Sequence, residues 1–192
     1  MPTAAHARVL LLLSSGLVTT RAAGAQVGQL GAAQVLSLVA VGPSVLGVTV
    51  ISGAVQSIPS LIDGALNIFP SPVVIRTNWN VSPGQTAIVN LVAYFPVPAQ
   101  ALTGGGTQIP SSRVLGRMAT GLPVAFTAMT QAPTAGVGTS GGSLQLFAQP
   151  ISGGNKQSSR TDNLDLELDL AGFPALRAGA YSGTLTLQAV TQ

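Results

Sequence analysis

Apolar and polar residues alternate most regularly near the end of the chain. Between 164 and 170 every second residue is leucine and the residues between them are acidic, and a second alternating run covers 181–189. Successive side chains of a strand point to opposite faces, so each run predicts a strand with one buried and one solvated face. The leucines expected in the core are Leu166, Leu168, Leu185 and Leu187, and the residues expected in solvent are Asp165, Glu167 and Asp169.

Weaker alternation elsewhere predicts the remaining strands. Expected strands lie at 46–50, 112–115, 124–129 and 143–149, and 73–95 is expected to be a hairpin with its turn at 82–85. Trp79 stands in an apolar row of this hairpin and is expected to anchor the core. Segment 57–66 is expected to be a short helix or irregular. About seven to nine strands between Gly- and Pro-rich turns favour an all-β, immunoglobulin-like antiparallel β-sandwich.

The N-terminus has the three parts of a secretory signal peptide. His6 and Arg8 precede a mostly apolar run at 9–18, and Ala23-Gly24-Ala25 offers a small-residue cleavage site. The apolar run is too short to span a bilayer. We expect 1–25 to be a cleaved signal peptide, with a buried N-terminal strand or helix as the alternative. No transmembrane helix is expected in the mature chain, which is placed outside the cytoplasm: secreted, on the cell surface or in the periplasm.

The mature chain is expected to have two parts. Segment 26–45 is apolar and uncharged, and 46–192 is the β-sandwich domain. In 26–45, apolar residues occupy both faces of the expected strand at 35–41. A free apolar strand invites aggregation, so the segment is expected to pair either within its own domain or with another subunit.

Composition excludes several kinds of chemistry. The chain contains no cysteine, and its one histidine, His6, lies in the predicted signal peptide. Thiolate metal sites, thiol nucleophiles and histidine bases are therefore excluded from the mature chain. Cleavage leaves six basic and five acidic residues, scattered without interleaved aromatics, so no nucleic-acid partner is expected. No cofactor and no catalytic residue is predicted, and the protein is expected not to be an enzyme.

Four of the five acidic residues lie close together near the C-terminus. Asp165, Glu167 and Asp169 share one face of a strand, about 6.5–7 Å apart, and Asp162 precedes them. A solvated face that deters edge-to-edge aggregation is the favoured interpretation. The four acids are also a calcium candidate if a loop supplies further oxygens. An inverting glycosidase pair fits the spacing, but no second acidic segment accompanies the row.

Segment 178–187, which reads AGAYSGTLTL, resembles the closing strand of bacterial pilin-like β-sandwiches, including spore coat protein U and chaperone–usher subunits. The stretch from Asn78-Trp79 through Tyr94-Phe95, together with Arg160-Thr161-Asp162, is similar to secreted bacterial sandwich proteins of unassigned function. The resemblance implies surface assembly through an exchanged strand, with no catalytic residues to carry over.

Two function classes follow. The first is a secreted or cell-surface structural or adhesive protein, such as a fibre subunit, whose partners are other copies of itself or other surface subunits. The second is an extracellular binding module for a glycan or protein, with its site in the loops at one end of the sandwich.

Overall fold

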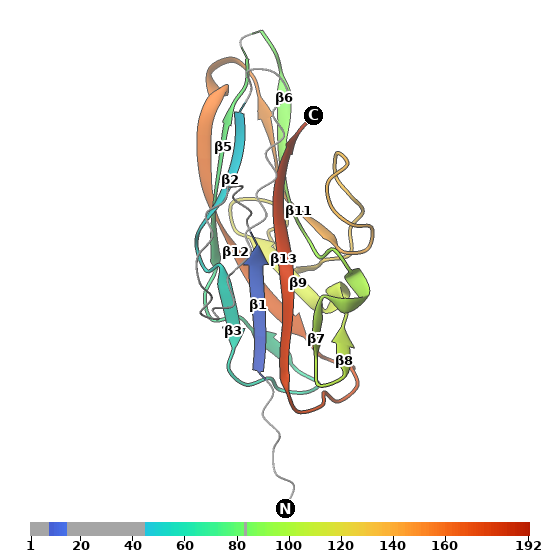
Figure 1. Ribbon diagram of the computed structural model, residues 1–192. Coiled ribbons are helices and arrows are strands. Elements are labelled where there is room, and N and C mark those ends of the chain that lie inside the picture. The colour runs from blue at the N-terminus through green and yellow to red at the C-terminus, as the bar shows by residue number, and fades with distance from the viewer. Residues whose placement is uncertain (1–7, 15–44, 83) are drawn as a thin grey trace, which may run out of the picture.

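The chain folds into two β-sheets that face each other in the computed structural model, which describes residues 8–14, 45–82 and 84–192 (Figure 1). Strand pairs in both sheets are antiparallel, with one exception at the N-terminus. The predicted all-β antiparallel sandwich is confirmed. No helix among these described residues is long and apolar enough to cross a membrane.

The first sheet has seven strands within the described residues. Five lie side by side in the order β11 (Ser143–Ile151), β6 (Ala87–Tyr94), β13 (Ala180–Thr191), β1 (Arg8–Ser14) and β3 (Val55–Ile58). Two short strands, β7 (Leu102–Gly104) and β8 (Thr107–Ile109), extend it beside β13.

The second sheet has six strands within the same ranges. Their order is β10 (Thr127–Ala128), β9 (Val114–Met118), β12 (Gln157–Asp169), β5 (Val73–Asn80) and β2 (Val45–Ser52), and β4 (Leu66–Ile68) pairs with the far end of β12. The 3₁₀ turns are η1 (Pro98–Gln100), η2 (Ser111–Arg113) and η3 (Gly153–Asn155). The described strands outnumber the expected seven to nine because β4, β7, β8 and β10 are only two or three residues long, too short to leave an alternation pattern.

The predicted hairpin over 73–95 is wrong. β5 pairs with β12 and β2 in the second sheet, whereas β6 pairs with β11 and β13 in the first. The turn itself forms, since the Gln85 amide donates to the Ser82 carbonyl over 3.3 Å. Two amphipathic strands joined by a turn can either pair with each other or enter facing sheets, and β5 and β6 enter facing sheets.

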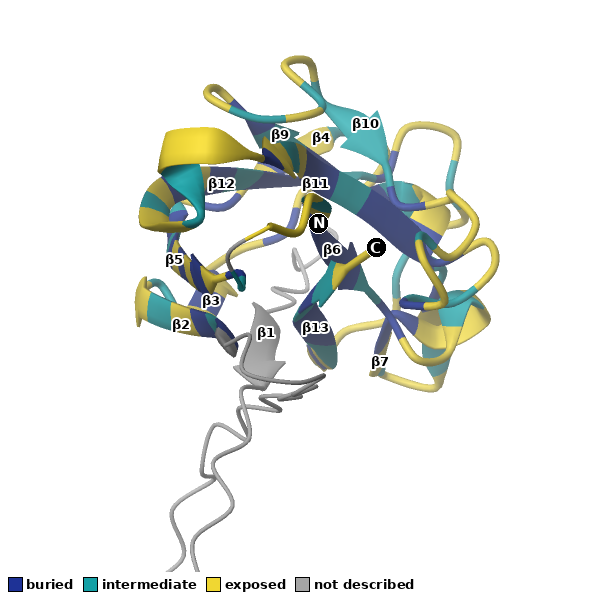
Figure 2. Ribbon diagram, turned by 90° about the horizontal axis from the view of Figure 1, so that it is seen from above, coloured by how far each residue is buried: buried dark blue, intermediate teal, exposed yellow. Residues whose placement is uncertain are grey.

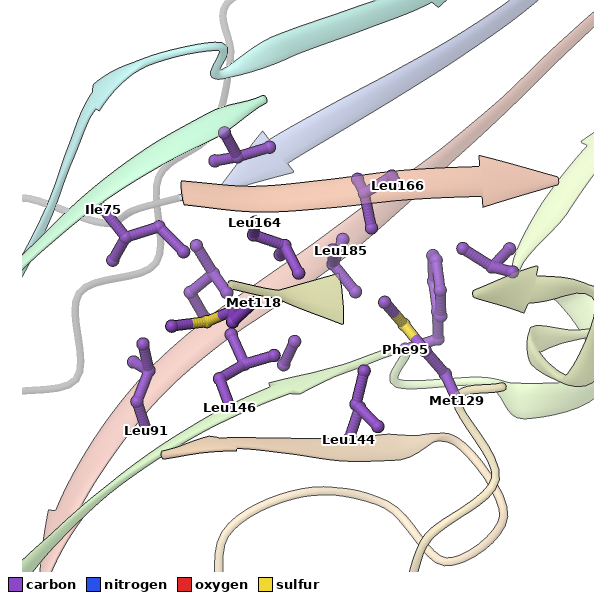
Figure 3. Close-up of a cluster of buried hydrophobic side chains, with 14 of the residues drawn as sticks. Ile75, Leu91, Phe95, Met118, Met129, Leu144, Leu146, Leu164, Leu166 and Leu185 are labelled. Carbon is purple, nitrogen blue, oxygen red and sulfur yellow. The ribbon is translucent and has the colours of Figure 1, made fainter. Parts of the chain in front are cut away.

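Burial alternates along β5 and along part of β12, whereas five successive residues of β6 (89–93) are buried, and the core lies between the sheets (Figure 2). Leu166, Leu168, Leu185 and Leu187 are all buried, as predicted, and Trp79 is only 5% exposed. Figure 3 shows leucines of β11, β12 and β13 meeting Met118 and Met129 between the sheets. The core therefore consists mostly of aliphatic side chains, with Tyr181, Phe95 and Phe147 as its largest fully buried members.

Segment 57–66 contains no helix. β3 ends at Ile58, and the following loop is held by the buried side chain of Asn67. The Asn67 Oδ1 accepts from the Ile62 amide at 2.8 Å, and its Nδ2 donates to the Ala65 carbonyl at 2.9 Å. The irregular alternative is thus the correct one. Segment 26–44 lies outside the described residues.

Two glycines allow the short β7 region to approach β13. A Cβ on Gly183 would lie 1.8 Å from the Ala101 carbonyl oxygen, and one on Gly104 would lie 2.0 Å from the Ala180 carbonyl oxygen. No side chain fits at such distances. The backbone of 101–104 therefore packs directly on β13, and the Tyr181 hydroxyl donates to the Arg177 carbonyl at 3.0 Å beside it.

Candidate functional sites: a strand position and an acidic strand

β1 occupies an internal strand position in the first sheet (Figure 1). It runs parallel to β13, with Arg8 opposite Ala180 and Ser14 opposite Thr186, and antiparallel to β3, with Val9 opposite Ile58. The pairing of β1 with β13 is the one parallel pairing among the described strand pairs. We call this position, between the facing edges of β13 (180–186) and β3 (55–58), the strand slot.

The slot opens onto the core. On β13 the residues Tyr181 and Leu185 face inward and are fully buried, and on β3 Gln56 and Ile58 are buried. The Gln56 side chain donates from Nε2 to the Gly53 carbonyl at 3.0 Å, which satisfies part of its polar group. Residues that lie opposite each other share a face, so a strand in this slot directs alternate positions into the core.

β3 depends on this position. Within the described ranges, β3 pairs with no strand other than β1. β13 keeps β6 and β7 on its other edge. Without a strand in the slot, β3 would therefore lose all of its strand pairing in the sheet. Residues 180–186 of β13 would then present an unpaired edge.

Sequence reasoning did not anticipate the slot. β1 falls within the predicted signal peptide. An apolar run of this length is compatible both with the hydrophobic region of a signal peptide and with a buried strand. The alternative of a buried N-terminal strand was the only sequence signal for it.

The predicted acidic residues divide between the two faces of β12. Asp162 points inward and is 3% exposed, whereas Asp165, Glu167 and Asp169 lie on the outer face. The alternation of β12 itself decides this, because Asp162 is an even number of residues from the buried Leu164 and Leu166.

Asp162 forms a buried ion pair with Arg160. Arg160 donates from Nε to Asp162 Oδ2 and from Nη2 to Asp162 Oδ1, both at 2.6 Å, and the Thr120 hydroxyl donates to Oδ1 at 2.7 Å. The Arg160 guanidinium carbon lies 4.3 Å from the centre of the Phe147 ring. Both carboxylate oxygens of Asp162 therefore accept hydrogen bonds from Arg160. The carboxylate is directed to this arginine and not to the other three acidic residues.

On the outer face, Asp165 is paired and Asp169 bonds locally. Arg117 donates to Asp165 Oδ2 from Nη2 at 2.8 Å, and these two side chains are 42% and 33% exposed. Asp169 Oδ1 accepts from the Ala171 amide at 2.8 Å. Both residues reach solvent, as the wet-face prediction requires.

Glu167 does not stay in solvent, and that part of the prediction is wrong. Its exposure is 8% because β12 is a central strand at this point, with Ile68 of β4 opposite on one side and Leu115 of β9 opposite on the other. Burial raises the pKa of Glu167 above its ordinary value; Arg117 opposes this rise, while the negative charges of Asp165 and Asp169 add to it.

The calcium assignment for Asp162, Asp165, Glu167 and Asp169 stays a prediction. The structure separates Asp162 from the other three acids by the thickness of β12. Across residues 8–14, 45–82 and 84–192, no group of three or more His, Cys, Asp or Glu side chains is arranged to hold a metal ion.

The fold and the slot define an all-β sandwich with a strand position supplied from the N-terminal part of the chain. No family model matches the chain, and no curated protein is similar to it in sequence.

Proposed function

We propose that the mature protein is a non-enzymatic structural or adhesive subunit, secreted or held at the cell surface, that accepts an extended strand from another subunit. The observation that carries the proposal is the pairing of β1 with β13 on one side and β3 on the other. Because β1 lies inside the predicted signal peptide, export would remove the strand that fills the slot.

An emptied slot needs a replacement. Backbone N–H and C=O groups along 180–186 and 55–58 would lose their partners beside a buried apolar surface, which is unfavourable and promotes association. An extended segment added at a sheet edge restores the main-chain hydrogen bonds, and its alternate side chains fill the space toward the core.

Residues 35–41 of a second copy suit this role. The segment has seven residues, as β1 has, and carries no charge. Apolar residues occur on both of its alternating sides, so either register directs apolar side chains to the core. The same segment of the same chain is the alternative occupant, in which case it is the first strand of its own domain.

A second class, an extracellular binding module for a glycan or protein, is favoured by a polar cavity between β11 and β12. Trp79 and Arg160 are among the residues that line it.

The first experiment deletes residues 26–41 from the mature protein. The slot then stays empty in every copy, so we expect the defined higher assemblies to be lost and the free energy of unfolding to fall, measured by size-exclusion chromatography with light scattering and by urea denaturation followed by circular dichroism. A deleted protein as stable as the full-length mature protein would show that residues 26–41 do not fill the slot. A full-length mature protein that is strictly monomeric would also contradict the proposal.

Disulfide trapping locates the contact, since the chain has no cysteine of its own. One preparation carries Thr184→Cys in the slot, and a second carries a single cysteine at one of the positions 35–41. Mixing under oxidation should give a disulfide-linked pair that contains one chain of each kind. Gln108→Cys, on exposed β8 away from the slot, is the matched control and should give none.

A further inference from the structure

A polar cavity lies where β11 and β12 meet across the sandwich. Its volume is about 420 Å³, within the ~300–1,000 Å³ range of small-ligand sites. The turn η3 connects the two strands beside it, and β12 contributes the exposed Ser158, the half-buried Arg160 and the buried Asp162. Trp79, Gln149 and Asn155 also line it. The cavity is therefore a polar hollow that opens to solvent, in contrast to the apolar core.

Arg160 is fixed in this cavity before any ligand arrives. Besides its two bonds to Asp162, its Nη2 donates to the Thr120 carbonyl at 2.7 Å, and the guanidinium lies over the Phe147 ring. Its Nη1 donates no hydrogen bond to any residue of the described ranges. A guanidinium held on three sides loses little freedom when it binds a ligand, which favours binding through the remaining N–H groups.

Further polar groups at the cavity lack partners within the part of the chain that the structure describes. Gln149 donates from Nε2 to the Pro150 carbonyl at 3.2 Å, so its Oε1 remains an acceptor, and the Ser158 hydroxyl makes no hydrogen bond. On the next strand, Thr77 lies opposite Arg160, and its fully buried hydroxyl is also unpartnered. Gln149 is half-buried and Ser158 is exposed, so their free groups face solvent and can bond a polar guest, whereas Thr77 does not itself line the cavity.

The charges and shape of the cavity select the class of guest. Asp162 neutralises Arg160, so an anionic ligand would have to compete with a buried carboxylate for the guanidinium. The free groups comprise both donors and acceptors, which vicinal hydroxyl groups match because each hydroxyl both donates and accepts. Trp79 borders the cavity but is only 5% exposed, so its indole contributes a narrow apolar edge beside these polar groups.

We infer that this cavity binds a neutral saccharide unit, with Arg160, Gln149 and Ser158 as the groups that bond its hydroxyls. The inference does not depend on strand exchange, because none of these residues belongs to the strand slot.

The protein carries its own reporter for this site. Trp79 is the single tryptophan of the chain, and its indole Nε1 donates to the Asn155 carbonyl at 2.8 Å beside the cavity. Intrinsic fluorescence of the whole purified protein is titrated with cellobiose, lactose, N,N′-diacetylchitobiose and, as the acidic arm, galacturonic acid. We expect a saturable change in emission with at least one neutral sugar and none with galacturonic acid.

Variants connect the signal to the cavity. Gln149→Ala and Ser158→Ala should each weaken binding roughly five-fold, the effect of one lost hydrogen bond, without loss of fold. Gln108→Ala on exposed β8 is the matched control and should leave binding unchanged. Arg160→Gln is a stronger test of the site, but it also breaks the ion pair with Asp162, so circular dichroism accompanies it.

Three results would overturn the inference. The first is the absence of any saturable signal with the three neutral sugars. The second is equal binding by Gln149→Ala, Ser158→Ala and Gln108→Ala. The third is preferential binding of galacturonic acid, which would mean that the pairing with Asp162 does not exclude anions.

Discussion

At the scale of single residues, burial decides what a charge contributes. The chain contains two arginine–aspartate pairs of similar distance within the described residues, Arg160–Asp162 at 2.6 Å and Arg117–Asp165 at 2.8 Å. The Asp162 side chain is 2% exposed, whereas that of Asp165 is 33% exposed. Removing one partner of a buried pair leaves an uncompensated buried charge. When one partner of an exposed pair is removed, water solvates the charge that remains.

We therefore expect Asp162→Asn to lower the free energy of unfolding by about 3 kcal/mol, the low end for a buried pair because Arg160 keeps some contact with solvent. Asp165→Asn, the matched change, should cost ~0–1 kcal/mol. Urea denaturation followed by circular dichroism measures both. Equal costs for the two variants would show that the Asp162 pair is not buried in solution.

Glu167 should make stability depend on pH. Its folded pKa is raised above the ordinary value of 4.5, mainly by burial. The folded state then binds more protons than the unfolded state between the two pKa values, so this residue lowers stability as pH rises from about 4.5 through the folded pKa. Below the ordinary pKa it has no such effect.

The variant Glu167→Gln should lack this contribution. We expect the free energy of unfolding of the native protein, relative to that of the variant, to fall as pH rises above about 4.5. Denaturation midpoints at several pH values test this. Parallel pH profiles for the two proteins would mean that Glu167 is solvated, as the alternation of β12 alone predicts.

At the scale of elements, the position of a strand in its sheet determines what its side chains contribute. β12 is the central strand of the second sheet, with β5 and β4 on one edge and β9 on the other. β4 has three residues, pairs only at one end of β12 within the described chain, and leaves Leu66 49% exposed. A leucine on β12 should therefore contribute more to the free energy of unfolding than a leucine on β4.

Leu168→Ala and Leu66→Ala compare these two positions with one substitution. Leu168 is fully buried, so its truncation should leave a cavity and cost ~2–5 kcal/mol. Leu66→Ala should change stability by less than about 1 kcal/mol. Chemical denaturation of both variants gives the result, and comparable midpoints would show that the inner and outer faces of the second sheet have been misassigned.

At the scale of the whole molecule, the N-terminus determines whether the first sheet is complete in one chain. If the predicted signal peptide is cleaved, the mature protein begins at Gln26 or within a few residues of it, and β1 is absent from it. Intact-mass spectrometry of the exported protein should find this mature start. Recovery of exported protein that retains 1–25 would show instead that β1 is a permanent strand of the sandwich.

The sequence by itself determined the properties that depend on neighbours along the chain. Period-two alternation is a local signal, and it identified β12, β13 and their buried leucines, the core position of Trp79 and the all-β class. The same alternation, extended two residues back from Leu164, places Asp162 on the inner face. Residue type alone would instead place this aspartate among the solvated acidic residues.

Only the tertiary structure decided which strands pair and what covers each face. A strand has the same alternation whichever sheet it joins, so β5 and β6 looked like one hairpin but entered opposite sheets. Glu167 is buried because strands distant in sequence flank it, and Arg160 meets Phe147 because β11 and β12 face each other. The strand slot is likewise a property of two edges, β13 and β3, which are brought together by the fold and separated by more than a hundred residues of chain.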